Sequence, residues 1–221
     1  VSTIFLSGVT GTFQQGEEVS AEENGFDNIL LPSCYELGID ATSFASAVSV
    51  ATNRIRLLLA VRMGEMWLPQ LARQMATIDQ MSGGRLTINI ISSDMPGQKL
   101  ESEPRYKRTR EYMKVLRDLL NGNPVDYHGE FVDLEIEAPR ARTVSGHCPP
   151  FYFGGFSEAA KETAAMESDV FLTWPDTVRG VGSIVSDMKE RASGYGRELK
   201  YGLRAHVIVR ESEKEARDAA N

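Results

Sequence analysis

A glycine turn between a strand pattern and a helix pattern is the first place where the sequence indicates chemistry. Residues 149–165 read PPFYFGGFSEAAKETAA, so Gly154 and Gly155 follow a short aromatic run and Ser157 precedes an alanine-rich helix. Glycines let the backbone approach a ligand, and the first N–H groups of a helix have no partners within it. This order favours a phosphate site, with the Ser157 hydroxyl as a further donor. The alternative is that the glycines only make a tight strand-to-helix connection.

A cation and an imidazole two residues apart are the second indication. Arg204 and His206 lie in the apolar pattern LRAHVIV (203–209). Alternation along a strand places them on one face, roughly 6–7 Å apart. Such a pair can hold an anionic substrate or an oxyanion. The alternative is the polar face of an edge strand, with Arg204 in a surface ion pair.

Four further residues are weaker candidates. Asn89 is expected to be a buried amide in an otherwise apolar strand, so it needs hydrogen-bond partners that a ligand can supply. Ser92 ends the same strand pattern. Trp174 ends another and suits packing against a substrate, although a tryptophan there also suits the core. Cys34 has no histidine or basic residue near it in the sequence to activate it, and its role stays open.

The elements that must position these residues alternate between strand and helix. Seven strand patterns occur, at 1–7, 27–32, 55–61, 86–92, 151–153, 169–174 and 203–209. Repeated βα units of about 30 residues predict a parallel sheet. A (β/α)₈ barrel needs about 250 residues, so the sequence predicts an α/β fold, a TIM-type barrel lacking its eighth unit.

An open doubly wound sheet is the alternative fold. Against it, no strand pattern is followed by G-x-G-x-x-G, and Gly180-Val181-Gly182 falls within a helical stripe. Local signals support the helices: Asp40 suits an N-cap and Pro69 suits a first helical turn. A further helix is expected over 105–120. Residues 125–147 predict a small exposed hairpin, inserted into a single domain of residues 1–221.

Bulk composition narrows the classes of partner. The 221 residues carry a formal net charge of −7, with a pI near 5.1, which argues against nucleic acid or an anionic membrane as the main partner. No apolar run is long enough to span a bilayer and no signal-peptide pattern is found, so we expect a cytoplasmic protein. Two cysteines and three histidines show no metal-ligand spacing. The chain begins in a strand pattern and stops in a helical one, as an excerpt of a longer polypeptide would.

Several stretches together resemble the bacterial luciferase-like flavin monooxygenases, and most closely the alkanesulfonate monooxygenase branch. The resemblance runs in consistent order through most of the chain. It is carried by RQMATIDQMSGGRLTINIISSD (73–94), YFGGFSEAAKETAA (152–165), DVFLTW (169–174) and YGLRAHVIVRESEKEA (201–216).

This resemblance implies a (β/α)₈ barrel that receives reduced FMN from a separate NAD(P)H-dependent flavin reductase. Such enzymes use O₂ to cleave the carbon–sulfur bond of an organosulfonate, giving an aldehyde and sulfite. Carried onto this sequence, the cofactor-binding residues are Asn89 and Ser92 beside the flavin ring, and Gly154, Gly155, Phe156 and Ser157 around its phosphate. A homo-oligomer, dimer or tetramer, is expected.

The resemblance also assigns catalytic positions. Trp174 would border the substrate cavity, Arg204 would meet the charge of the sulfonate or of the activated oxygen, and His206 would supply a proton or a hydrogen bond. The family's histidine-bearing loop after the first strand has no counterpart here, since residues 7–10 read SGVT.

Three alternative functions remain at this point. One is a deazaflavin (F420)-dependent oxidoreductase of the same fold, although FMN is the favoured cofactor. Another is a non-catalytic flavin-binding protein on a shortened barrel. The third is a metabolic barrel without flavin.

Overall fold

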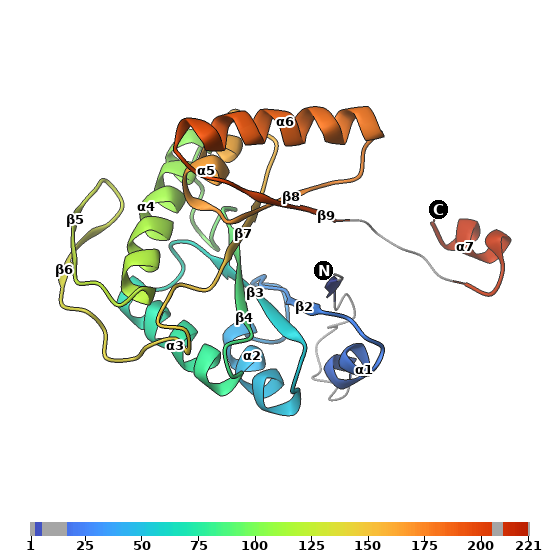
Figure 1. The fold of residues 1–221 in the computed structure, drawn as a ribbon, viewed down its shortest axis with the longest axis horizontal. Helices are drawn as coiled ribbons and strands as arrows, with labels where there is room; N and C mark the ends of the chain where they lie inside the picture. Colours follow the sequence, from blue (N-terminus) through green and yellow to red (C-terminus); the bar gives the residue numbers. More distant parts are fainter. Residues whose placement is uncertain (1–2, 6–16, 205–209, 221) are drawn as a thin grey trace.

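The computed structural model describes residues 3–5, 17–204 and 210–220. Its main sheet has seven parallel strands in the order β1-β2-β3-β4-β7-β8-β9, curled with helices on its outer side (Figure 1). The strands are β1 (Thr3–Phe5), β2 (Asn28–Leu31), β3 (Arg56–Arg62), β4 (Leu86–Ile91), β7 (Phe151–Gly154), β8 (Val170–Thr173) and β9 (Lys200–Leu203). This is the α/β architecture of an incomplete barrel, as the sequence predicted.

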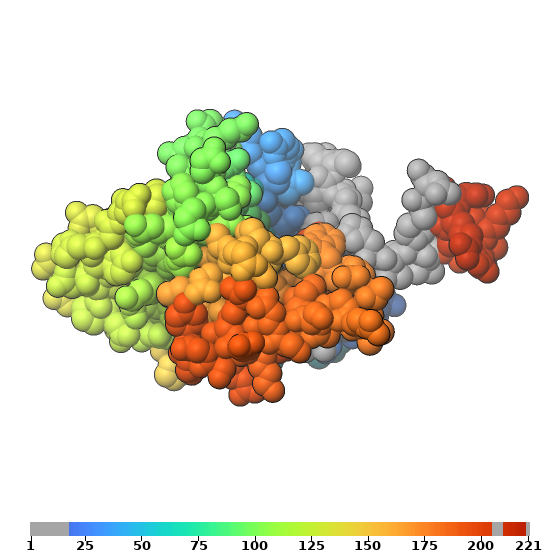
Figure 2. Space-filling model, turned by 90° about the horizontal axis from the view of Figure 1, so that it is seen from above, coloured from blue at the N-terminus to red at the C-terminus, as the bar shows by residue number. Residues whose placement is uncertain are grey.

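Helices connect the strands. They are α1 (Glu17–Glu23), α2 (Ala41–Ala51), α3 (Leu68–Met81), α4 (Ser102–Leu120), α5 (Glu158–Glu167), α6 (Val178–Gly194) and α7 (Glu213–Ala220). Helices α5 and α6 lie side by side on one face of the molecule (Figure 2). None of the helices in the described residues is long and apolar enough to cross a membrane.

The core lies between the sheet and its helices. On the helix-covered face, Leu57, Leu59, Ile88, Phe151 and Phe153 are essentially inaccessible to solvent. The central five residues of β3 are all buried, as the almost unbroken apolar run at 55–61 indicates for a strand covered on both faces. Burial of these side chains supplies the main driving force for closing the helices onto the sheet.

The concave face of the sheet is more open. Asn89 is paired in register with Ala60 on β3 and Tyr152 on β7, so the three side chains share this face. Asn89 and Tyr152 are both half-buried. The expectation that Asn89 is a buried amide is therefore wrong, because its side chain is only partly covered.

Local sequence signals account for several helix ends. The Asp40 carboxylate accepts a hydrogen bond from the Ser43 N–H at 2.7 Å, which confirms the predicted N-cap of α2. Pro69 lies in the first turn of α3, where its missing N–H has no cost. At the other end of α3, Gly83 and Gly84 both have positive φ, the backbone conformation that glycine accepts most readily.

Two elements begin three residues earlier than predicted. Helix α4 begins at Ser102 instead of Arg105, because Pro104 fits the first turn of a helix and does not stop it. Strand β9 begins at Lys200, where its ladder with β8 starts, although the apolar pattern begins at Leu203. The continuation of the predicted strand, residues 205–209, lies outside the described residues.

The predicted hairpin is present. Strands β5 (Val125–His128) and β6 (Asp133–Ile136) pair antiparallel, apart from the main sheet (Figure 1). Its turn is held by Glu111 of α4, whose carboxylate accepts hydrogen bonds from three consecutive N–H groups, those of Glu130, Phe131 and Val132, at 2.8–3.2 Å. One buried carboxylate therefore fixes the whole turn to the body of the molecule.

Candidate active site at the carboxyl ends of the strands

Most of the predicted site residues follow neighbouring strands. β4, β7, β8 and β9 are adjacent in the sheet, and all run in the same direction. Ser92 follows β4, the turn at residues 154–157 follows β7, Trp174 follows β8 and Arg204 follows β9. These positions therefore share one edge of the curled sheet, where barrel enzymes carry their active sites. His206 lies outside the described residues.

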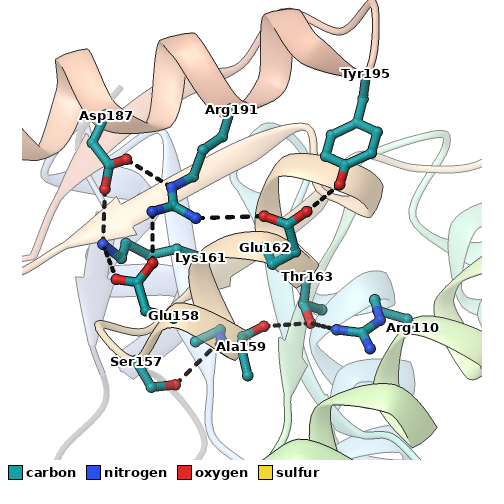
Figure 3. Close-up of polar contacts among 11 residues, drawn as sticks. Arg110, Ser157, Glu158, Ala159, Lys161, Glu162, Thr163, Asp187, Arg191 and Tyr195 are labelled. Carbon is teal, nitrogen blue, oxygen red and sulfur yellow. Dashed lines mark hydrogen bonds and ion pairs between the residues drawn. The ribbon is translucent and has the colours of Figure 1, made fainter.

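The amino end of α5 has N–H groups available to a ligand. Ser157 is its N-cap, and the Ser157 hydroxyl accepts a hydrogen bond from the Ala160 N–H at 3.2 Å (Figure 3). The first N–H bonded to a helical carbonyl is that of Lys161, to the Ser157 oxygen at 2.9 Å. The N–H groups of Glu158 and Ala159 lie before it and point out of the helix end, where an oxyanion is favoured.

The two glycines before α5 are required by packing. A Cβ at Gly154 would lie 2.7 Å from the Leu172 oxygen, and one at Gly155 would lie 2.6 Å from the Ala160 Cβ. The alternative reading, a tight strand-to-helix connection, therefore explains why glycine stands at both positions. Phe156, which follows them, is about half exposed (49%), so the turn is open to solvent.

Tyr106 is a candidate that the sequence did not reveal. It lies in the second turn of α4, with its ring edge-on to Phe153 at a centroid distance of 6.3 Å. Its hydroxyl would be 3.6 Å from a Cβ at Gly155, so it faces the turn that leads into α5. A phenolic donor beside free helical N–H groups extends the candidate oxyanion site. The helical pattern over 105–120 does not indicate this neighbour.

Arg204 and Trp174 are in contact. The guanidinium carbon of Arg204 lies 4.5 Å from the centre of the Trp174 ring. The main-chain N–H of Arg204 donates to the main-chain oxygen of Thr173 at 2.8 Å. Both side chains are exposed at the strand ends. The face of the Trp174 ring therefore orients the guanidinium of Arg204. Since β9 is an edge of the described sheet, the edge-strand alternative for Arg204 is also compatible with this placement.

Ser92 and Asn89 differ in how far their polar groups are engaged. The Ser92 hydroxyl lies 2.6 Å from the Thr109 hydroxyl, which itself donates to the Arg105 oxygen at 3.0 Å. With the Thr109 proton directed to the Arg105 oxygen, the Ser92 hydroxyl is the donor that this arrangement favours. The half-buried amide of Asn89 remains on the concave face, where a planar ligand would meet it.

A cavity of about 500 Å³ opens where β2 and β3 end. Cys34 and Arg62 both line it, so the fold supplies the basic residue that the sequence did not place near Cys34. The Cys34 thiol contacts the Glu36 carboxylate. Arg62 donates to the Ser33 and Asp94 oxygens and thereby joins the loops that follow β2 and β4. The volume suits a small-molecule ligand.

Comparison with known proteins identifies the family. The family model described as luciferase-like monooxygenase matches residues 18–221. The chain belongs to the luciferase-like monooxygenase family. Among its relatives in this family, the sulfoquinovose monooxygenase of Novosphingobium aromaticivorans is 56% identical over 208 residues, which cover 91% of this chain and 58% of that protein. The chain thus spans little more than half the length of this curated relative.

Solved structures of luciferase-like proteins share the fold. EDTA monooxygenase from Chelativorans sp. BNC1 superimposes with a TM-score of 0.81 at 16% identity, covering 91% of this chain and 59% of that one. The coenzyme F420-dependent tetrahydromethanopterin reductase from Methanopyrus kandleri gives 0.79 at 22% identity, covering 97% and 67%. At these identities the likeness concerns the fold alone. A monooxygenase and an F420-dependent reductase both share it.

Proposed function

We propose that this protein is a reduced-FMN-dependent monooxygenase that uses O₂ to cleave an organosulfonate into an aldehyde and sulfite. The observation that carries the proposal is the Arg204 guanidinium stacked on Trp174, which follows β8, the strand next to β7 and its turn into α5. The substrate class follows from the sulfoquinovose monooxygenase that is 56% identical, so a sugar sulfonate is the first candidate.

The residues around α5 fit the phosphate of FMN. The N–H groups of Glu158 and Ala159, the Ser157 hydroxyl and the Tyr106 hydroxyl surround one helix end. The positive end of the helix dipole favours a dianion there. Asn89, on the concave face, would meet the flavin ring. Reduced FMN, when bound, supplies the electrons that activate O₂, and a separate NAD(P)H-dependent flavin reductase is the proposed source.

The substrate is held by charge and shape. Arg204 presents a planar fork of N–H donors to the sulfonate oxygens, and Trp174 keeps that fork in one orientation. We assign His206 the proton transfer at the reacting carbon, from its place two residues after Arg204 in the sequence.

Sulfite release is the test of this proposal. The full chain is incubated with FMN, a flavin reductase, NADH and a panel of sulfonates that includes sulfoquinovose and linear alkanesulfonates. We expect sulfite that depends on both the reductase and O₂, with the sugar sulfonate preferred. Arg204→Ala is expected to abolish sulfite release while FMN binding persists.

Other outcomes separate the alternatives. Binding of F420 in preference to FMN would assign hydride transfer to this barrel. FMN binding without sulfite from any sulfonate would point to another carbon substrate or to a flavin-binding protein. If the chain neither binds flavin nor releases sulfite, the proposal is overturned entirely.

A further inference from the structure

Four charged side chains of α5 and α6 form a closed ring beside the proposed phosphate site (Figure 3). Lys161 Nζ lies 2.6 Å from Glu158 and 2.8 Å from Asp187. The Arg191 guanidinium lies 2.6 Å from Glu158 and 2.7 Å from Asp187, and it also lies 3.4 Å from Glu162. Two acids and two bases therefore alternate, and each contacts both members of opposite charge.

The ring includes the residue nearest to the helix end. Glu158 is the first residue of α5 and directly follows the N-cap Ser157. A carboxylate at this position is attracted to the same N–H groups and helix dipole that would hold a phosphate. In the structure it instead points toward Lys161 and Arg191, on the side of α5 that faces α6 (Figure 3).

The two bases are well placed to hold it there. Their side chains are mostly buried between the helices, with 17% of Lys161 and 27% of Arg191 exposed. Hydrogen bonds from Lys161, and then from Arg191, lower the pKa of the Glu158 carboxyl. Glu158 is therefore an anion at neutral pH whose charge is balanced by its neighbours.

We propose that the Glu158–Lys161–Asp187–Arg191 ring is a positioning device that neutralises Glu158 and turns it away from the α5 N-terminus, and thereby makes this helix end selective for a phosphorylated flavin. The inference rests on the proposed function, because it takes the FMN phosphate to lie at this helix end. The side chains of these four residues act through the helix end and do not themselves contact the ligand.

The test compares FMN with riboflavin, which lacks the phosphate. Dissociation constants of the full chain are measured by flavin fluorescence for the parent protein, Arg191→Met, and Arg191→Met combined with Glu158→Gln. We expect Arg191→Met to weaken FMN binding on the order of fivefold, because the Glu158 carboxylate is then an uncompensated charge near the phosphate dianion. Binding of riboflavin should be unchanged. The double variant, whose ring is still broken, is expected to regain FMN affinity.

Controls distinguish charge from structure. Tyr195→Phe removes the contact of Tyr195 with Glu162 at the edge of the ring and should change neither ligand. Lys161→Met, alone and with Glu158→Gln, repeats the comparison from the other base if Arg191→Met does not fold. Equal loss in the single and double variants, or parallel loss of riboflavin, would overturn the inference. Equal binding of FMN and riboflavin by the parent protein would overturn the phosphate site itself.

Discussion

Ser157 offers a way to separate the stability of α5 from its binding of phosphate. Its hydroxyl caps the helix through the Ala160 N–H, and the same exposed group is proposed to contact the FMN phosphate. Ser157→Ala removes both interactions. Ser157→Asp keeps a capping oxygen, because aspartate caps as well as serine does, but places a negative charge where the phosphate should bind.

The two variants are expected to rank differently in stability and in FMN affinity. Loss of the cap in Ser157→Ala should lower the free energy of unfolding by about 1 kcal/mol, whereas Ser157→Asp should change it by less than about 0.5 kcal/mol. For FMN, the alanine variant loses one hydrogen bond to a charged group, which is about tenfold in affinity. In the aspartate variant, the carboxylate and the FMN phosphate repel each other at roughly 4 Å. This repulsion costs about 2–3 kcal/mol, which lowers FMN affinity at least about 30-fold.

Urea unfolding followed by circular dichroism measures the stability of each variant, and titration with FMN measures its affinity for FMN. Stability should fall in the order parent, aspartate, alanine, and FMN affinity in the order parent, alanine, aspartate. General damage to the fold cannot produce both orders. If Ser157→Asp binds FMN as tightly as the parent does, the phosphate does not lie at this helix end.

Three further predictions concern other parts of the molecule. Arg85 directs all five N–H groups to four main-chain carbonyls and one hydroxyl, so Arg85→Met should lower the free energy of unfolding by about 3 kcal/mol in urea, and Arg85→Lys by less. The Asp133 carboxylate raises the pKa of His128, so any stabilisation of the hairpin is present below pH 6.5 and is lost as the pH rises through the folded-state value. NMR titration should place this midpoint above 6.5, and Asp133→Asn should lower it; an unchanged midpoint would exclude the pair. Trp174→Leu should raise KM for the sulfonate several-fold at unchanged FMN affinity, and an unchanged KM would remove Trp174 from the substrate site.

The parts of the fold that depend on local rules could be predicted from the sequence. Asp40 was recognised as an N-cap, and Ser157 was placed directly before a helical pattern, because capping needs only a short polar side chain at such a position. The apolar run of β3 likewise indicated a fully covered strand. Alternating strands and helices then limited the topology to a parallel sheet.

The parts of the fold and of the site that depend on tertiary contacts could not be predicted from the sequence. Tyr106 belongs to a helix whose periodicity indicates a buried face but not its neighbour, so its approach to Gly155 was not predictable. The start of β9 is set by its ladder with β8 and not by its apolar residues. In the ring of charges, Glu158 and Lys161 are three residues apart, but Arg191 comes from another helix at no characteristic spacing.

The hairpin clamped by Glu111 has a practical consequence for experiments on this protein. The hairpin connects the end of α4 to the start of β7, whereas the proposed site lies where β7 ends. Three hydrogen bonds to one carboxylate hold its turn, but the outward side chains of β5 and β6 are exposed. A fluorophore or an immobilising tag attached to these outward positions would report on the protein without occupying the proposed site.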